Sequence, residues 1–236
     1  MELSPNTWLD YLSTIAKKIN HLKGTYVEMG FGKGITSYYT LYEMINNRIK
    51  KRDMWGFDSF KGFPHPSPHD NLDVAKKGHL TFPIKHALDF KTYAKKKHNI
   101  NVNIIEGYFK DTIKQYNGGP IAILHLDVDL YDSYKICLEN LYDLVIPGGL
   151  IMFDEYKSTT LLRWPGATKA IDEFLEDKNI EIKKHYIKNP YKTWKYGLLN
   201  SWKDIKLPRT PINNKTSGIG ITKYTPTEKY YIYKPL

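Results

Sequence analysis

Residues 25–34, TYVEMGFGKG, carry the strongest structural signal in the chain. The first five residues, which are mostly apolar or β-prone, predict a strand over 25–29, and the glycines predict a sharp turn into a helix over about 34–48. A strand that turns directly into a helix is typical of a βαβ unit. Because glycines let the backbone approach a ligand closely, and because Glu28 lies at the strand end, this turn is also a candidate binding site.

The glycine spacing excludes two common nucleotide-binding motifs. In a dinucleotide-binding G-x-G-x-x-G motif the third glycine would stand at position 35, where this chain has Ile35. No Gly-Lys-Ser/Thr follows at the distance that a P-loop requires. A tight β–α turn without any ligand is the simpler alternative.

The rest of the chain continues the alternation of short apolar runs and amphipathic stretches. It predicts one doubly wound, Rossmann-like α/β domain over residues 1–236, with its ligand at the carboxyl ends of the strands. The further helices are expected at 6–22, 84–97, 132–145 and 166–176. The further strands are expected at 54–57, 102–106, 121–126, 150–153 and 180–187, with a turn at 147–149 and an edge strand at 229–233.

Composition narrows the class of protein. The 236 residues are 41% hydrophobic and 25% charged, which is ordinary for a globular protein. No apolar run is long enough to span a membrane, and the N-terminus does not look like a signal peptide. The single cysteine, Cys137, excludes an internal disulfide or a multi-cysteine metal site. We therefore expect a cytoplasmic protein with no membrane partner.

Positive charge is concentrated at the C-terminal end. Of the net charge of +10, residues 181–236 carry +9, and their lysines are interleaved with tyrosines. The basic, Tyr-rich segment 190–236 predicts an anionic partner such as a phosphorylated small molecule or RNA, and a solvated face is the alternative. Only 4 of the 35 basic residues are Arg, which weakens the case for bidentate phosphate or base recognition.

Acidic residues follow the predicted strands. Asp58 ends the second strand, where an acid commonly binds ribose hydroxyls, although a turn or helix cap is the alternative. Asp127 and Asp129 follow the strand 121–126, and the pair 154–155 (Asp-Glu) follows the strand 150–153. Clustered oxygen ligands without cysteine favour Mg²⁺. The alternative is that Asp127 and Asp129 cap the next helix.

A long irregular segment over 59–80, rich in proline, contains His65, His69 and His79. Long loops inside compact domains are usually lids or binding loops, so we expect this segment to cover the site.

Several runs resemble class I S-adenosylmethionine (SAM)-dependent methyltransferases, and more narrowly the macrocin O-methyltransferase (TylF-type) family of metal-dependent sugar O-methyltransferases. They occur in the family's order over about residues 25–176. The similar runs are the E-x-G-x-G-x-G turn, FDSFKGFP (57–64), EGYFKDT (106–112), LDVDLYDS (126–133), and the stretch from DEY (154–156) to AIDEF (170–174).

The resemblance implies a seven-stranded, mostly parallel sheet and assigns roles to residues. The methyl donor would contact Glu28, Gly30, Gly32, Gly34, Asp58, Ser59, Gly107, Tyr108 and Asp127. Mg²⁺ would be held by Asp127, Asp154 and Glu155. Related sequences usually have Asp or Asn at the last position, so the longer Glu155 is a departure, and Asp129 is an alternative ligand or donor contact.

The implied reaction transfers a methyl group to a hydroxyl of a sugar or sugar-containing small molecule. A divalent ion lowers the pKa of the hydroxyl, and a general base removes its proton. Besides Asp127, we expect His79 to be catalytic, with His69 as the next choice. His125 lies inside a strand and is expected to be buried. Lys61 and Tyr131 are candidate acceptor contacts.

Two other functions stay open at this point. An RNA methyltransferase would use the basic, aromatic C-terminal segment to bind and stack bases, although an acidic acceptor site would repel phosphates. A non-catalytic protein of this fold would bind a nucleotide-like ligand and pair with another chain. A homo-oligomer is also open, since dimers are the commonest symmetric assembly.

Overall fold

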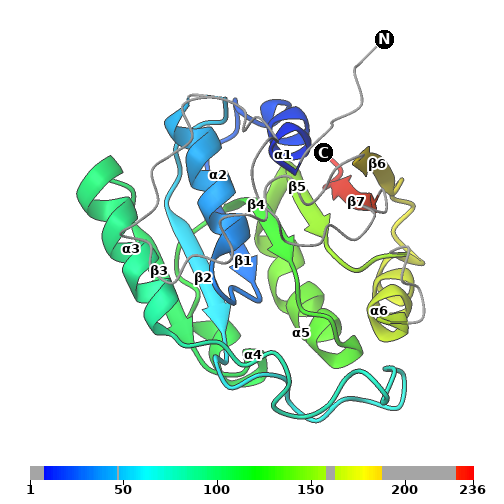
Figure 1. Cartoon of the computed structure of the whole chain (residues 1–236). Helices are drawn as coiled ribbons and strands as arrows, with labels where there is room; N and C mark the ends of the chain where they lie inside the picture. The colour runs from blue at the N-terminus through cyan, green and yellow to red at the C-terminus, as the bar shows by residue number, and fades with distance from the viewer. Residues whose placement is uncertain (1–7, 47, 158–162, 188–226) are drawn as a thin grey trace, which may run out of the picture.

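The computed structural model describes residues 8–46, 48–157, 163–187 and 227–236. Its strands form one seven-stranded sheet in the order β3-β2-β1-β4-β5-β7-β6 (Figure 1). The five strands β1 to β5 pair in parallel, and β7 runs antiparallel to both β5 and β6. The strands are β1 (Thr25–Met29), β2 (Met54–Asp58), β3 (Val102–Glu106), β4 (Ile121–Leu126), β5 (Val145–Phe153), β6 (Lys183–Ile187) and β7 (Thr227–Tyr233). The expected doubly wound, mostly parallel sheet is confirmed.

Helices cover both faces of this sheet (Figure 1). One face packs against α1 (Trp8–Lys17), α2 (Ile35–Ile45) and α3 (Lys85–His98). The other packs against α5 (Tyr131–Leu141) and α6 (Pro165–Leu175), with the short α4 (Phe109–Thr112) beside α5. Among the described residues, no helix is long and apolar enough to cross a membrane.

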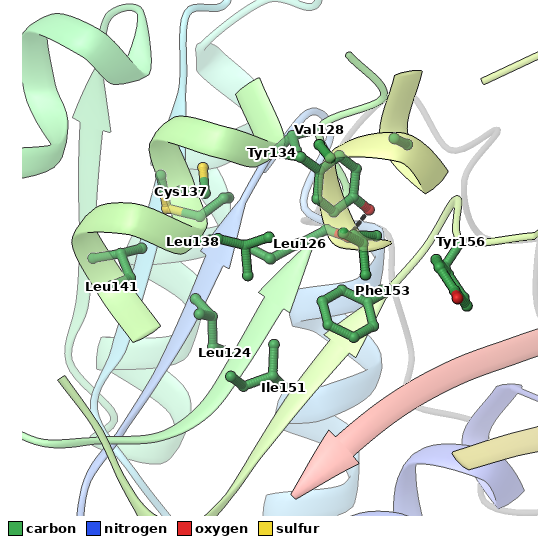
Figure 2. Packing of buried hydrophobic residues seen from close by; sticks show 14 of the residues in the cluster. Leu124, Leu126, Val128, Tyr134, Cys137, Leu138, Leu141, Ile151, Phe153 and Tyr156 are labelled. Carbon is green, nitrogen blue, oxygen red and sulfur yellow. Dashed lines mark hydrogen bonds between the residues drawn. The ribbon is translucent and has the colours of Figure 1, made fainter. Parts of the chain in front are cut away.

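Alternation along the central strands explains the two layers, because successive side chains point to opposite faces. In β5, Leu150 and Met152 belong to the first apolar cluster, whereas Ile151 and Phe153 belong to the second. Figure 2 shows the second cluster, in which leucines of β4 and residues of β5 pack against α5. Cys137 of α5 is fully buried there.

Two sequence predictions about the last strands are wrong. The segment 229–233 was expected at a sheet edge, but β7 lies between β5 and β6. It pairs with both neighbours, and its residues Tyr231 and Ile232 are buried on opposite faces of the sheet. The Pro-Gly-Gly run at 147–149 is not a turn before the strand but lies inside β5. The pairing moves there from Ile121↔Val145 to Ile123↔Leu150, so β5 bulges.

The loop from β2 to α3 contains no helix or strand, as the sequence predicts for 59–80. In Figure 1 it runs along the lower edge of the view, from the end of β2 past α4 and α5. The strand ends and this loop together frame the candidate site.

Candidate functional site

The carboxyl ends of four central strands lie at one edge of the sheet. The register pairs Met29 of β1 with Phe57 of β2 and with Leu126 of β4, and Leu126 with Phe153 of β5. The residues that follow these positions are therefore neighbours across the sheet. The structure therefore places the glycine turn and the acidic residues at the same edge of the sheet, as the sequence predicts.

The turn after β1 needs its glycines. Gly30, Gly32 and Gly34 have φ angles of 86°, 51° and 72°, in the left-handed region. Gly30 also packs directly on the backbone of β4's end, since a Cβ there would lie 1.8 Å from the carbonyl oxygen of Asp127. The glycine turn and the first acidic residue after β4 are thus in direct contact.

Asp58 joins the tip of β2 to this turn. Its Oδ2 accepts the backbone N–H of Gly32 at 2.8 Å, and its Oδ1 accepts that of Phe60 at 2.7 Å. Burial raises the pKa of Asp58, and the two backbone donors oppose that rise. No helix begins directly after Asp58, because the next one, α3, begins at Lys85; of the two structural alternatives, Asp58 therefore lies in a turn and does not cap a helix.

The neighbouring predicted donor residues hold local structure. The Ser59 hydroxyl donates to the carbonyl of Gly62 at 2.8 Å. Gly107 donates its N–H to the carbonyl of Asp58 at 2.9 Å, and Tyr108 follows it as the residue before α4. These contacts place Ser59, Gly107 and Tyr108 beside Asp58 at the same sheet edge.

Glu28 is buried within the protein rather than presented at this edge. It is 1% exposed, and its Oε2 accepts the hydroxyls of Tyr26, at 3.0 Å, and of Ser37 in α2. Its Oε1 lies 3.6 Å from Nδ1 of His125, which is buried as expected. Burial alone would lower the pKa of His125, but the contact with Glu28 and the charges of Asp127 and Asp154 together outweigh it, so the pKa is raised.

Three carboxylates gather after β4 and β5. One oxygen each from Asp127, Asp154 and Glu155 lies within 4.8 Å of the others. Backbone bonds hold the first two in place, because Asp127 donates its N–H to the Met29 carbonyl and Asp154 donates to the Leu126 carbonyl, each at 3.0 Å. We call these three residues the acidic cluster. The family resemblance implied these three residues as metal ligands, and the structure brings them together.

The electrostatics of the acidic cluster favour a bound cation. Burial and the charge of Asp154 raise the pKa of Asp127 to about 7. Burial and the neighbouring acids raise the pKa of Glu155 well above its usual value. Burial would also raise the pKa of Asp154, but the charges of Lys229 and His125 and the hydrogen bonds with Lys229 and Glu155 together outweigh it, so the pKa is lowered. Hard oxygen donors that crowd their negative charge in this way fit Mg²⁺.

Glu155 and Asp129 have protein partners of their own. The hydroxyl of Tyr134 lies 2.5 Å from Oε2 of Glu155 and 3.0 Å from the Leu126 carbonyl. Asp129 has a φ of 59° and donates its N–H to the same Glu155 oxygen at 3.4 Å. Burial and the charges of Asp127 and Asp154 raise its pKa well above the usual value.

Lys229 of β7 is the member of this site that the sequence did not reveal. Its Nζ donates to the backbone carbonyl of Asp154 at 3.0 Å and to Oδ1 of the same residue. Seventy-five residues separate the two along the chain. The only available signal was a lysine in a short alternating strand, and that pattern does not say which strand lies beside it.

The loop after β2 is anchored over the acidic edge. Asp70, 7% exposed, accepts the backbone N–H of Tyr131 through Oδ1 at 2.9 Å, and the N–H and hydroxyl of Ser67 through Oδ2. Asp70 therefore caps α5, and the alternative in which Asp127 and Asp129 cap it is wrong. A second anchor is the edge-on contact between Phe63 and Trp164 before α6, with ring centroids 5.7 Å apart.

The loop histidines differ in what they contact. The ring of His69 lies 4.5 Å from that of Tyr131, four residues after Asp127. His79 lies with Nδ1 3.1 Å from the Val74 carbonyl and packs edge-on against Phe63. Both side chains are exposed, as are those of His65 and Lys61. Among the contacts described for the two, only that of His69 reaches the segment that carries the acidic cluster.

The basic C-terminal segment 190–236 falls largely on residues 188–226, which lie outside the described residues.

The amino-acid sequence is similar to those of known O-methyltransferases. A family model described as Macrocin-O-methyltransferase (TylF) matches residues 6–195. The chain is 30% identical over 140 residues to the 8-demethyl-8-(2,3-dimethoxy-alpha-L-rhamnosyl)-tetracenomycin-C 4'-O-methyltransferase of Streptomyces olivaceus, covering 56% of this chain and 53% of that protein. It is 26% identical over 168 residues to the demethyldecarbamoylnovobiocin O-methyltransferase of Streptomyces niveus, covering 66% and 59%. The chain thus spans little more than half the length of these curated relatives.

Solved structures share the fold. The O-methyltransferase NovP has a TM-score of 0.64 at 20% identity, covering 97% of this chain and 79% of that one. CalS11, described as a calicheamicin methyltransferase, has a TM-score of 0.66 at 19% identity, covering 95% and 77%. At these identities the likeness establishes the arrangement of strands and helices, which is that of class I methyltransferases.

Proposed function

The chain belongs to the macrocin O-methyltransferase (TylF) family, and from this premise we propose that it transfers a methyl group from SAM to a hydroxyl of a sugar or sugar-containing small molecule. The relatives support the acceptor class, since one is named for a rhamnosyl-bearing tetracenomycin and another, CalS11, is described as a TDP-rhamnose 3'-O-methyltransferase. In this proposal the chain acts as one methyltransferase domain, and the loop over 59–80 covers the acceptor side.

The observation that carries the proposal is the contact between the glycine turn and the acidic cluster. Gly30 lies against the backbone of Asp127, so a donor held on the turn would have its reactive end beside the carboxylates. Methyl transfer needs the sulfonium carbon and the acceptor oxygen in line and close together, and holding both reactants at adjoining sites supplies that orientation.

The donor end of the site is built from β1, β2 and β3. The exposed backbone of Gly30, Gly32 and Gly34 would cradle the methionine and ribose parts, and Asp58 would accept from ribose hydroxyls through lone pairs that its backbone donors leave open. Ser59, Gly107 and Tyr108 would border the nucleoside. Glu28 would act from behind, by fixing β1 to α2 through Ser37, rather than by touching the donor.

The acceptor end is the acidic cluster. Asp127, Asp154 and Glu155 would hold Mg²⁺, which supplies Lewis-acid activation of an acceptor hydroxyl when bound. Asp127, which also contacts the glycine turn through its backbone, would link this end to the donor end. Asp129 stays a second candidate for a ligand or donor contact.

A proton must leave the acceptor hydroxyl as the new bond forms. We propose a loop histidine as the proton acceptor, with His79 the choice from the sequence and His69 the choice from its contact with Tyr131. Tyr131, whose hydroxyl donates to Glu173 at 2.7 Å, would hold His69 in place. Comparing the His69→Ala and His79→Ala variants by their kcat for methyl transfer distinguishes the two.

The test uses radiolabelled SAM with a panel of nucleotide-sugars and glycosylated aglycones. We expect label in a sugar hydroxyl, loss of transfer in chelator, and recovery with Mg²⁺. Asp127→Asn should abolish transfer while calorimetry still detects S-adenosylhomocysteine (SAH) binding. The matched control is Asp132→Asn, an exposed acid of α5, which should leave transfer unchanged. Transfer that persists in chelator would overturn the metal role, and SAH that fails to bind would overturn the methyltransferase assignment.

A further inference from the structure

Lys229 is fixed beside the acidic cluster by the register of β7. The antiparallel pairing of β5 with β7 ends at Phe153↔Tyr230. Continuing this register, Lys229, the residue before Tyr230, lies opposite Asp154, the residue after Phe153. The Lys229 side chain is 13% exposed, and its Nζ contacts both the carboxylate and the backbone carbonyl of Asp154. A cation of the protein itself is therefore seated among the proposed metal ligands.

The charges of the three residues of the acidic cluster balance only when this lysine is counted with a bound divalent ion. When ionised, the three carboxylates of the acidic cluster carry three negative charges, of which a divalent ion neutralises two. Lys229 supplies the third positive charge. With the lysine removed, the metal-free cluster would consist of three half-buried or buried carboxylates without the positive partner that the structure shows at Asp154, an arrangement that proteins avoid.

The same charge opposes a second cation. Two positive charges that share Asp154 repel each other, and the repulsion is larger at a partly buried site than in water. Lys229 also keeps one carboxylate oxygen of Asp154 occupied, which leaves the other for an ion. Both effects reduce the affinity for a divalent ion below what the three carboxylates alone would give.

We propose that Lys229 is the built-in counter-ion of the acidic cluster: it stabilises the fold when no divalent ion is bound, and it weakens the binding of that ion. The second half rests on the metal assignment in the proposed function, whereas the first half concerns the metal-free protein. The role is one of positioning and charge balance, because Lys229 acts through its contact with Asp154, a proposed ligand residue.

The experiment compares Lys229→Met, Lys229→Arg and Lys234→Met in the full chain. Met keeps the length and apolar stem of the lysine and removes its charge, and Arg keeps the charge. Lys234 follows β7 and donates to the carbonyls of Tyr142 and Asp143, away from the cluster, so its variant controls for losing a lysine beside this strand. The readouts are thermal unfolding in chelator and with Mn²⁺, and calorimetric Mn²⁺ binding without donor or acceptor.

We expect Lys229→Met to unfold at a lower temperature in chelator and to bind Mn²⁺ at least about tenfold more tightly. The difference in Tm between the Mn²⁺-bound and chelated forms should then widen. Lys229→Arg should resemble the wild type, and Lys234→Met should leave that difference unchanged. The proposal is overturned if Lys229→Met binds Mn²⁺ as the wild type does or more weakly, or if its stability in chelator is unchanged.

A second variant covers the case in which Lys229→Met does not fold in chelator. Adding Asp154→Asn removes the partner charge, so the double variant should fold, and a double variant that stays unfolded would show a packing role instead. The outcomes also separate this inference from the proposed function. If no acceptor is methylated but the Lys229 variants behave as expected, only the proposed function fails. If an acceptor is methylated but the Lys229 variants do not behave as expected, only the inference about Lys229 fails.

Discussion

The carboxylate of Asp58 accepts the backbone N–H of Gly32 at 2.8 Å, so the end of β2 sets the shape of the turn that follows β1. The same side chain also accepts the N–H of Phe60. One residue thus holds together two backbone segments on which the proposed donor site depends.

Replacing Asp58 with Ala should therefore weaken donor binding. Each unpaired backbone N–H costs about 1–3 kcal/mol where it stays buried, and the proposed ribose contact is lost as well. We expect SAH affinity, measured by calorimetry, to fall at least about tenfold. Asp58→Asn keeps one acceptor oxygen, so its SAH affinity should lie between those of the wild type and Asp58→Ala. An Asp58→Ala protein that binds SAH like the wild type would contradict this account of the turn.

Gly30 offers a test of the contact between donor turn and acidic cluster. In Gly30→Ala the new Cβ would meet the Asp127 carbonyl at 1.8 Å, so either the turn or the end of β4 must move. We expect the variant to lose both SAH and Mn²⁺ binding. The control is Gly119→Ala, since Gly119 has a similar φ of 76° but open space around it. It should cost only the strain of the left-handed backbone, about 1–2 kcal/mol, and keep both ligands.

Asp70 tests whether the loop over 59–80 serves the acceptor side. Asp70→Ala removes the cap of α5 and should lower the free energy of unfolding by about 1–2 kcal/mol in urea titrations. Because the loop would lose its anchor at Tyr131, we expect a higher KM for the acceptor and unchanged SAH affinity. Asp73→Ala, an exposed acid of the same loop, is the control. An effect of Asp70→Ala on SAH affinity alone would place the loop at the donor side instead.

The sequence predicted the parts of the site that depend on strand ends. The strands 25–29, 102–106 and 121–126 occur in the structure with those bounds, because a short apolar run and the glycine or acid after it mark where a parallel strand stops. Since parallel strands end at one edge, the neighbourhood of Asp127, Asp154 and the glycine turn followed without knowledge of any contact.

Long-range partners could not be predicted in the same way. Asp70 caps a helix that begins 61 residues later, and Lys229 pairs with an acid 75 residues earlier. No periodicity encodes such pairings, because they depend on how the loop and the last strand are placed in space. Glu28 shows the same limit, since its position at a strand end predicted a ligand contact, whereas its side chain turns inward to Ser37 and His125.

The raised pKa of Asp127 predicts a pH dependence for the metal-free protein. Burial and the charge of Asp154 raise that pKa to about 7, against about 3.9 in an unfolded chain. The folded state therefore binds the proton more tightly, and the stabilisation is complete below about pH 4 and is lost as the pH rises through about 7. The lowered pKa of Asp154 acts in the opposite direction, but its contribution is lost only as the pH falls below its ordinary value of 3.8.

In chelator, the protein should accordingly have a lower free energy of unfolding at about pH 8 than at about pH 6, measured by urea titration. Asp127→Asn should flatten this dependence, since the amide does not titrate, and Asp132→Asn should retain it. Saturating Mg²⁺ should also flatten it, because an ion that binds the ionised carboxylate stabilises the folded state where the proton is lost. If Asp127→Asn keeps the slope of the wild type, Asp127 is not the group that titrates in this range, and the pH dependence arises from other acids with a raised pKa, such as Glu155 or Asp129.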